Sequence, residues 1–116
     1  MRYAVLLEIS VAMPDRIDHL RRRVDALNTH LLELVQERAE IVLEISRLKE
    51  ELGLDSYDPR REEEMLRRLT TNTSGPFGPA EIRSIFRAIF RASLGLQERT
   101  RKRLARRATV RSEAAP

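Results

Sequence analysis

The chain of 116 residues contains no cysteine, and only 4% of its residues are aromatic. The absence of cysteine excludes disulfides, thiolate nucleophiles and cysteine-based metal sites. The low aromatic content, together with 34% charged residues and many Leu, Arg, Glu and Ala residues, predicts an all-helical protein with a thin core. No apolar stretch reaches the about 20 residues that a membrane-spanning helix needs.

A seven-residue apolar repeat runs through residues 17–52. With Ile17 at position a, ten of the eleven a and d positions are aliphatic, and the exception is Arg38 at position a. The aliphatic positions are Ile17, Leu20, Val24, Leu27, Leu31, Leu34, Ile41, Ile45, Leu48 and Leu52. We call this set the apolar seam. An arginine is costly to bury without an anionic partner, so we expect a negative group to meet Arg38.

Two structural explanations for Arg38 stay open. Its charge could pair with Glu33 or Glu37 on a helix, or its long side chain could reach out to solvent. The neighbouring positions favour a ligand, because Arg21 and Lys49 both fall at position e on the edge of the apolar seam. Three cations therefore border one apolar surface.

The predicted first helix is too long to bury the apolar seam within one chain. At about 1.5 Å per residue, residues 17–52 span about 54 Å, beyond the about 30 Å of a small domain. The natural partner is a second copy, which predicts an obligate homodimer. Arg21 and Lys49 are about 42 Å apart on one helix, so one small ligand cannot touch both in the same chain. If two first helices pair antiparallel about residue 32, Arg21 of one chain lies between Arg38 and Lys49 of the other. Such a pocket suits a compact ligand with two carboxylates.

Helix signals divide the chain into three segments. The first helix is predicted to begin after Pro14 or Asp15 and to end at Gly53. The second, with Asp58 as its N-cap, runs over residues 59 to about 71, and the third begins near residue 79 and continues toward residue 103. We expect residues 1–12 to be an extension outside the fold.

The predicted third helix has one apolar face, and two polar residues, Ser93 and Gln97, interrupt it. A buried glutamine needs partners for its amide, so Gln97 either caps a backbone group or touches a polar ligand. The two histidines, His19 and His30, have a spacing that suggests neither a metal cluster nor a catalytic triad. A chemistry that needs only placement and charge fits better, such as the unimolecular rearrangement of a dianion.

The basic charge is concentrated at the C-terminus. Residues 1–96 hold 15 Lys and Arg against 16 Asp and Glu, whereas residues 97–116 hold 7 against 2. The basic residues are Arg99, Arg101, Lys102, Arg103, Arg106, Arg107 and Arg111. This tail could bind nucleic acid or an acidic protein surface, or it could be a solvated helix end.

Several motifs occur in the order and at the spacing of one family. They are LRRRVDALNTHLLELVQER with the following Lys49, DPRRE at residues 58–62 and SLGLQ at residues 93–97. Residues 15–98 thereby resemble the all-helical AroQ class of chorismate mutase. The run NTSGPFGPAEIRSIFRAIFRASLGLQE looks especially like the mutase domain fused to some deoxy-arabino-heptulosonate phosphate synthases.

The resemblance implies a role for each charged position. Arg38 and the Arg21 of the partner chain would hold the two carboxylates of chorismate. Lys49 would lie at a carboxylate and the ether oxygen, and Gln97 would donate a hydrogen bond to that same oxygen.

The resemblance also implies the residues around the substrate ring. Asp58, through its backbone, and Glu62, through its side chain, would hold the ring hydroxyl. Arg61 would support the charged wall, and Ser93 would lie near a carboxylate.

We therefore predict three helices per chain, one long, one short and one medium to long, in an intertwined homodimer. Residues 1–14 would be an N-terminal extension, residues 15–98 the mutase domain and residues 99–116 the basic tail. The resemblance implies a chorismate mutase without cofactor or metal, acting in the cytoplasm on the route to phenylalanine and tyrosine.

Two alternatives stay open. One is a regulatory module that binds chorismate or prephenate, or docks on a separate deoxy-arabino-heptulosonate phosphate synthase. The other is a nucleic-acid binder that acts through the tail, which leaves Arg38, Lys49 and Gln97 unexplained.

Overall fold

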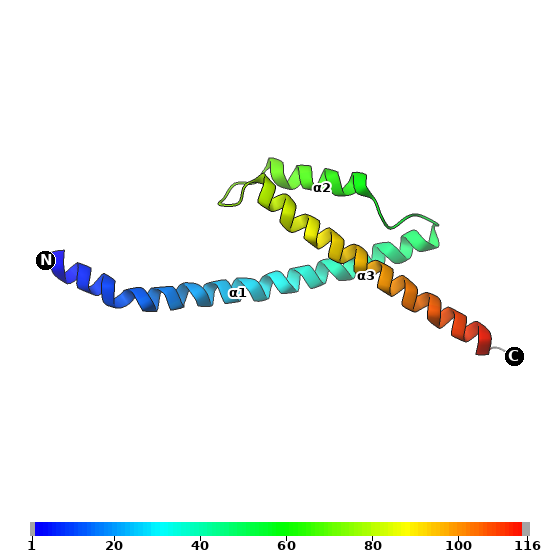
Figure 1. Ribbon diagram of the computed structural model, residues 1–116, viewed down its shortest axis with the longest axis horizontal. Coiled ribbons are helices and arrows are strands. Elements are labelled where there is room, and N and C mark those ends of the chain that lie inside the picture. The colour runs from blue at the N-terminus through cyan, green and yellow to red at the C-terminus, as the bar shows by residue number, and fades with distance from the viewer. Residues whose placement is uncertain (1, 115–116) are drawn as a thin grey trace. The chain divides into compact units, whose positions relative to one another are not determined.

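The computed structural model describes the backbone of residues 2–114 and the side chains of residues 13–114. It contains three helices, α1 (Arg2–Glu51), α2 (Pro59–Thr71) and α3 (Pro79–Ala114) (Figure 1). No strand occurs in residues 2–114, so the predicted all-α class is confirmed. The chain divides into a first unit, Met1–Glu37, and a second unit, Arg38–Pro116.

The predicted start of the first helix is wrong. Helix α1 already begins at Arg2, and Pro14 lies inside it. Proline has a φ angle that fits a helix, although its missing N–H and its ring disrupt one hydrogen bond to the preceding turn. The Leu and Ala residues before it favour a helix and offset this cost. The prediction that residues 1–12 are an extension outside the fold stays a prediction, because the side chains of these residues lie outside the described part of the chain.

In the first unit the apolar seam is open to solvent. Leu27 is 59% exposed and Leu31 is 57% exposed, and the seam residues before them are similar. A fully buried leucine contributes about 1.5–3 kcal/mol relative to an exposed one. The apolar seam therefore contributes little hydrophobic stabilisation in the described part of this unit.

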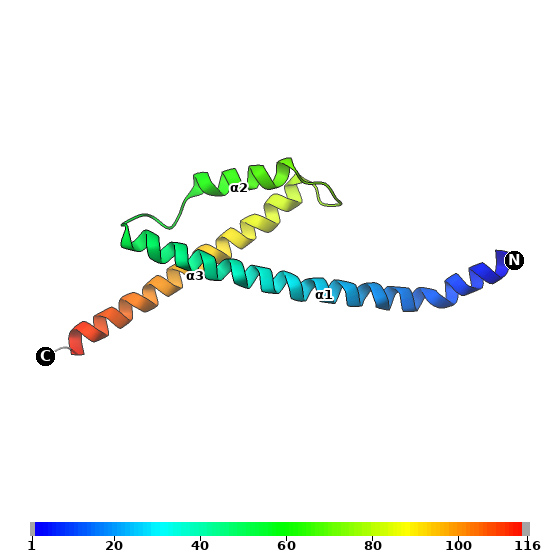
Figure 2. The same ribbon diagram turned by 180° about the vertical axis from the view of Figure 1, so that it is seen from behind.

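The second unit has a small core where α2 packs on α3 (Figures 1 and 2). Leu66 of α2 is 2% exposed and Phe90 of α3 is 6% exposed, and they are the buried hydrophobic residues of the described chain. Within the described residues no helix has an apolar stretch of the length needed to cross a membrane.

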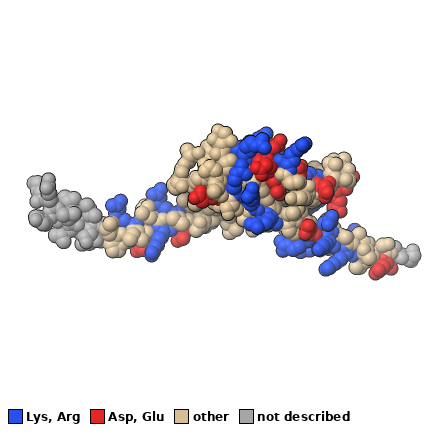
Figure 3. Space-filling model, turned by 45° about the horizontal axis from the view of Figure 1, so that its top comes forward, with Lys and Arg blue, Asp and Glu red and all other residues tan. Residues whose placement is uncertain are grey.

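Helix α3 is longer than the sequence predicts. It continues to Ala114 rather than to about residue 103, so the basic tail is helical as far as it is described. The reason is composition, because residues 96–114 contain no glycine or proline and are rich in Arg and Ala. Figure 3 shows Lys and Arg side chains gathered along this part of α3, and residues 101–114 are all exposed.

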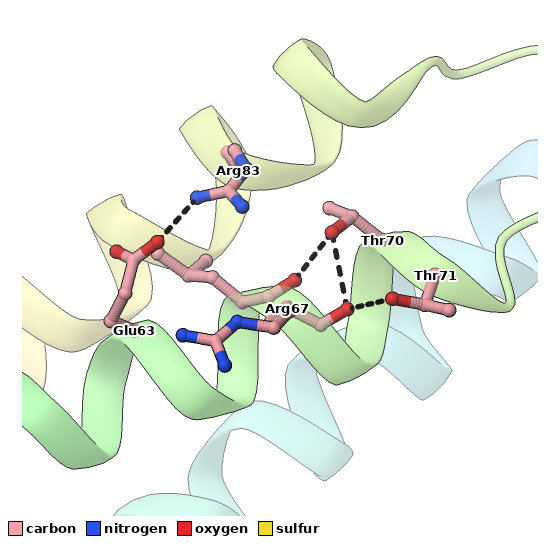
Figure 4. Close-up of polar contacts among 6 residues, drawn as sticks. Glu63, Arg67, Thr70, Thr71 and Arg83 are labelled. Carbon is pink, nitrogen blue, oxygen red and sulfur yellow. Dashed lines mark hydrogen bonds and ion pairs between the residues drawn. The ribbon is translucent and has the colours of Figure 1, made fainter.

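An exposed ion pair also joins α2 to α3 (Figure 4). Arg83 Nη1 donates to Glu63 Oε1 at 3.0 Å, and this hydrogen bond is the main reason why the pKa of Glu63 lies below its ordinary value. A lowered folded-state pKa means that the pair stabilises the fold above the ordinary carboxyl pKa. That contribution is lost as the pH falls through the folded-state value.

The two kinds of α2–α3 contact should differ in their effect on stability. Leu66→Ala should lower the free energy of unfolding by about 2–5 kcal/mol, because it leaves a cavity in a core with few members. Glu63→Gln should lower it much less, because exposed ion pairs are screened by water. Denaturant unfolding at pH 7, at one protein concentration, measures both. Equal losses would contradict this account of the interface.

Candidate active site

Arg38 of α1 contacts Phe90 and Ser93 of α3, the helix that crosses the C-terminal part of α1 (Figures 1 and 2). Its side chain is partly buried, and Nη1 donates a hydrogen bond of 2.9 Å to Ser93 Oγ. The Arg38 Cζ atom lies over the Phe90 ring, 5.4 Å from its centroid. Neither contact is with a carboxylate, so both leave the positive charge of the arginine in place.

Lys49 lies in the last turn of α1 on the same face as Arg38. Eleven residues separate them, which is about three turns and about 16 Å along the helix. The helix ends just beyond Lys49, as predicted, at Gly53 with a φ of 69°. The Leu54 N–H donates to the Lys49 carbonyl at 2.7 Å and the Gly53 N–H to the Glu50 carbonyl at 3.1 Å, a Schellman ending. The Lys49 cation therefore lies at a helix C-terminus, where the helix dipole favours it.

The start of α2 carries three predicted site residues, Asp58 just before the helix and Arg61 and Glu62 in its first turn. Asp58 is the N-cap, as predicted, and its Oδ1 accepts from the Arg61 N–H at 3.1 Å. The Asp58 carbonyl accepts from the Glu62 N–H at 3.2 Å. Asp58 and Arg61 are exposed, whereas Glu62 is partly buried. The cap thus fixes the Glu62 backbone one turn after Asp58.

Ser93 and Gln97 lie one turn apart on α3, and both are partly buried. Ser93 Oγ donates to the Ile89 carbonyl at 2.7 Å. Gln97 Oε1 is buried and has no hydrogen-bond partner among the described residues. A buried amide oxygen without a donor is costly, so its partner is to be sought in a ligand or in another chain.

Arg21 is the one predicted site residue in the first unit, where its side chain is exposed. The other seven lie in the second unit, six of them on its helices and Asp58 immediately before α2. Among those seven, the direct side-chain contact is the hydrogen bond between Arg38 and Ser93.

Phe90 is a residue that the sequence analysis missed. It is 6% exposed, it contacts Arg38, and its ring lies 6.3 Å from that of Phe86. Its position four residues after Phe86 and three before Ser93 places it on the same helix face. That spacing was a usable signal.

The second unit has an open hollow of about 630 Å³ beside Phe90. Glu62, Phe90 and Leu94 line it together with Arg87 and Arg91. Of the eight predicted site residues, Glu62 alone lines it. In the part of the chain that the structure describes, no three acidic or histidine side chains gather as they would around a metal ion.

Residues 20–98 match the family model of chorismate mutase type II, which is more than half of the chain. The chain belongs to the type II chorismate mutase family. It is similar in structure to a chorismate mutase of Thermus thermophilus (form II), with a TM-score of 0.71 and 54% identity, over 72% of this chain and 96% of that chain. The chorismate mutase of Helicobacter pylori, solved in complex with prephenate, gives a TM-score of 0.70 and 31% identity over 74% and 93%.

A curated relative adds a different domain arrangement. The chain is 33% identical over 93 residues to the bifunctional chorismate mutase/prephenate dehydratase of Pseudomonas aeruginosa, and it spans about a quarter of that protein (26%). The predicted AroQ class is confirmed by the family match. The closer likeness to domains fused to a synthase stays a prediction, because this relative is fused to a dehydratase.

The buried amide oxygen of Gln97 predicts an unusual response to substitution. Gln97→Met keeps the length of the side chain and removes the unpartnered oxygen. We expect the free energy of unfolding to stay within about 1 kcal/mol of the parent value or to rise, because no internal hydrogen bond is lost. Thermal and denaturant unfolding measure this. A loss of more than about 2 kcal/mol would show that Gln97 holds the fold together.

Proposed function

We propose that this chain catalyses the rearrangement of chorismate to prephenate. In this unimolecular reaction the ether C–O bond breaks while a C–C bond forms within the same molecule. No proton, electron or second reactant is exchanged. The site has only to hold the dianion in a reactive conformation and to stabilise the charge that develops on the ether oxygen.

The observation that supports the proposal best is that the Arg38 guanidinium has only neutral contacts among those described above. Its guanidinium is held by a hydroxyl at 2.9 Å and by an aromatic ring at 5.4 Å, which are both neutral. A carboxylate in their place would use the donor fork of the arginine and offset its charge. With neutral neighbours, both remain for a carboxylate of the substrate.

The other roles follow from the family and from the positions described above. We assign Lys49 to a carboxylate and to the ether oxygen, to which Gln97 also donates. The donor would be Gln97 Nε2; the buried Oε1, which has no partner among the described residues, can only accept, and it supports contact of the amide with a group from outside the chain. Asp58 and Glu62, at the capped start of α2, are assigned to the ring hydroxyl.

Three further assignments complete the site. Arg61 supports the charged wall. Ser93 holds Arg38 beside a carboxylate. Arg21, contributed by a second chain, holds the other carboxylate.

The homodimer is part of the proposal. The exposed apolar seam supports it, because leucines such as Leu27 (59%) and Leu31 (57%) need a cover. Helix α1 is 50 residues long, so Arg21 and Lys49 of one chain, about 42 Å apart, cannot meet the same small ligand. A shared site removes this difficulty. We also propose that the enzyme works in the cytoplasm on the route to phenylalanine and tyrosine, with a separate deoxy-arabino-heptulosonate phosphate synthase as its docking partner.

A direct assay tests the proposal. Purified protein should deplete the ultraviolet absorbance of chorismate, and the product should be prephenate by chromatography. If the protein binds chorismate or prephenate without turnover, it is a regulatory module. If it binds neither ligand, the proposal is wrong.

Gln97 offers a test by pH. An amide donates a hydrogen bond at every ordinary pH, whereas a carboxyl group donates only when protonated. Gln97→Glu should therefore lose activity progressively as the pH rises, while the parent changes much less. Initial rates of chorismate loss across the pH range measure both proteins. Identical pH profiles would place Gln97 away from the ether oxygen.

Subunit mixing tests the shared site. Arg21→Ala and Lys49→Ala homodimers should each be nearly inactive. When the two proteins are unfolded and refolded together, each heterodimer should contain one site with both cations intact and one site lacking both. With random pairing, about a quarter of all sites should recover, provided that the sites act independently.

The control is each variant refolded alone. Mass spectrometry verifies that heterodimers form. Verified heterodimers without any recovered activity would rule out the shared site.

A further inference from the structure

The Arg38 guanidinium is held from two directions by one face of α3. The Phe90 ring lies under its Cζ atom at 5.4 Å, and Ser93 Oγ accepts from Nη1 at 2.9 Å. Phe90 and Ser93 are three residues apart, so they are neighbours on the helix surface. The ring restrains the guanidinium from one face, and the hydroxyl restrains it at one edge.

The Ser93 hydroxyl can act only as an acceptor toward Arg38. A hydroxyl has one hydrogen, and that of Ser93 is donated to the Ile89 carbonyl at 2.7 Å. Its remaining lone pairs face the arginine, whose nitrogens are all donors. Ser93 therefore orients Arg38, and its proton is already committed to the backbone.

The Phe90 ring is a fixed surface against which the Arg38 guanidinium lies. Its side chain is 6% exposed, so its ring has little room to move. A cation over an aromatic face within about 6 Å is attracted to the ring, and the attraction increases when water is excluded. Unlike a carboxylate, the ring does not occupy the N–H donors. Four of the five N–H groups of Arg38 stay available after the bond to Ser93.

We propose that Phe90 is a positioning residue, which fixes the Arg38 guanidinium through its ring face so that the free N–H donors meet a substrate carboxylate. This inference rests on the proposed mutase function. Arginine has a long side chain with considerable rotamer freedom, and fixing it before the substrate arrives reduces the entropy lost on binding. Phe90 thus acts through Arg38 and has no contact of its own with the reacting bonds.

The test compares three single variants. Phe90→Leu keeps an apolar side chain but removes the ring face, and it should lower kcat/KM about tenfold. Phe90→Tyr keeps the ring face, has the open hollow beside it for the added hydroxyl, and should stay within about threefold of the parent. Phe86→Leu is the packing control, because the Phe86 ring lies 6.3 Å from that of Phe90, whereas the cation–π contact of Arg38 is with Phe90. It should change kcat/KM by less than about threefold while lowering the melting temperature as Phe90→Leu does.

A spectroscopic measurement follows the position of Arg38 without relying on activity. The ring current of Phe90 should shift the side-chain protons of Arg38 upfield in NMR spectra of the whole protein. The shift should vanish in Phe90→Leu and persist in Phe90→Tyr and Phe86→Leu. Arg38 resonances that are the same in the parent and in Phe90→Leu would overturn the proposal. So would an equal loss of kcat/KM in Phe86→Leu and Phe90→Leu.

These two measurements separate the inference from the proposed function. A parent protein without chorismate turnover refutes the function, whereas the Arg38 shift still decides whether Phe90 holds the guanidinium. An active parent in which Phe90→Leu keeps full kcat/KM refutes the inference and leaves the function standing.

Discussion

The second unit is organised around one requirement, which is to hold the charge of Arg38 against an apolar helix face without neutralising it. A buried carboxylate would compensate the charge, but it would also occupy the donors that the proposed function assigns to a substrate carboxylate. The structure instead uses the Phe90 ring at 5.4 Å and the Ser93 hydroxyl at 2.9 Å. The contact between α1 and α3 at this crossing thus contributes to the fold and leaves the cation available. The two roles are compatible because both neighbours are neutral.

The hydrophobic core beside Arg38 is small. Leu66 and Phe90 are the buried hydrophobic residues of the described chain, while the apolar seam of α1 stays exposed. One of these two core residues is also the surface against which the Arg38 guanidinium lies. A change at Phe90 therefore affects packing and the arginine together, which is why matched variants are needed to separate the two effects. The proposed homodimer would cover the apolar seam, so stability and site assembly would depend on the same association.

Local signals predicted most helix boundaries and failed at two, the start of α1 and the end of α3. Asp58 as N-cap and Gly53 as the residue past the helix end are short-range effects of side-chain hydrogen bonding and of a positive φ. Pro14 misled the prediction, because proline is compatible with a helix when neighbouring residues favour it. The extension of α3 to Ala114 was underestimated, since a run of like charges suggested fraying and the helix-forming composition prevailed.

The sequence by itself determined the helical class, the apolar seam with Arg38 in it, and the spacing of charged residues that is typical of type II chorismate mutases. These features follow from periodicity and residue chemistry, which need no knowledge of distant neighbours. Only the tertiary structure decided that Arg38 meets Ser93, 55 residues away, and that Phe90 supplies the facing ring. Such contacts depend on where and in what rotation α3 crosses α1. That crossing is set by the packing of many side chains together, and no single motif encodes it.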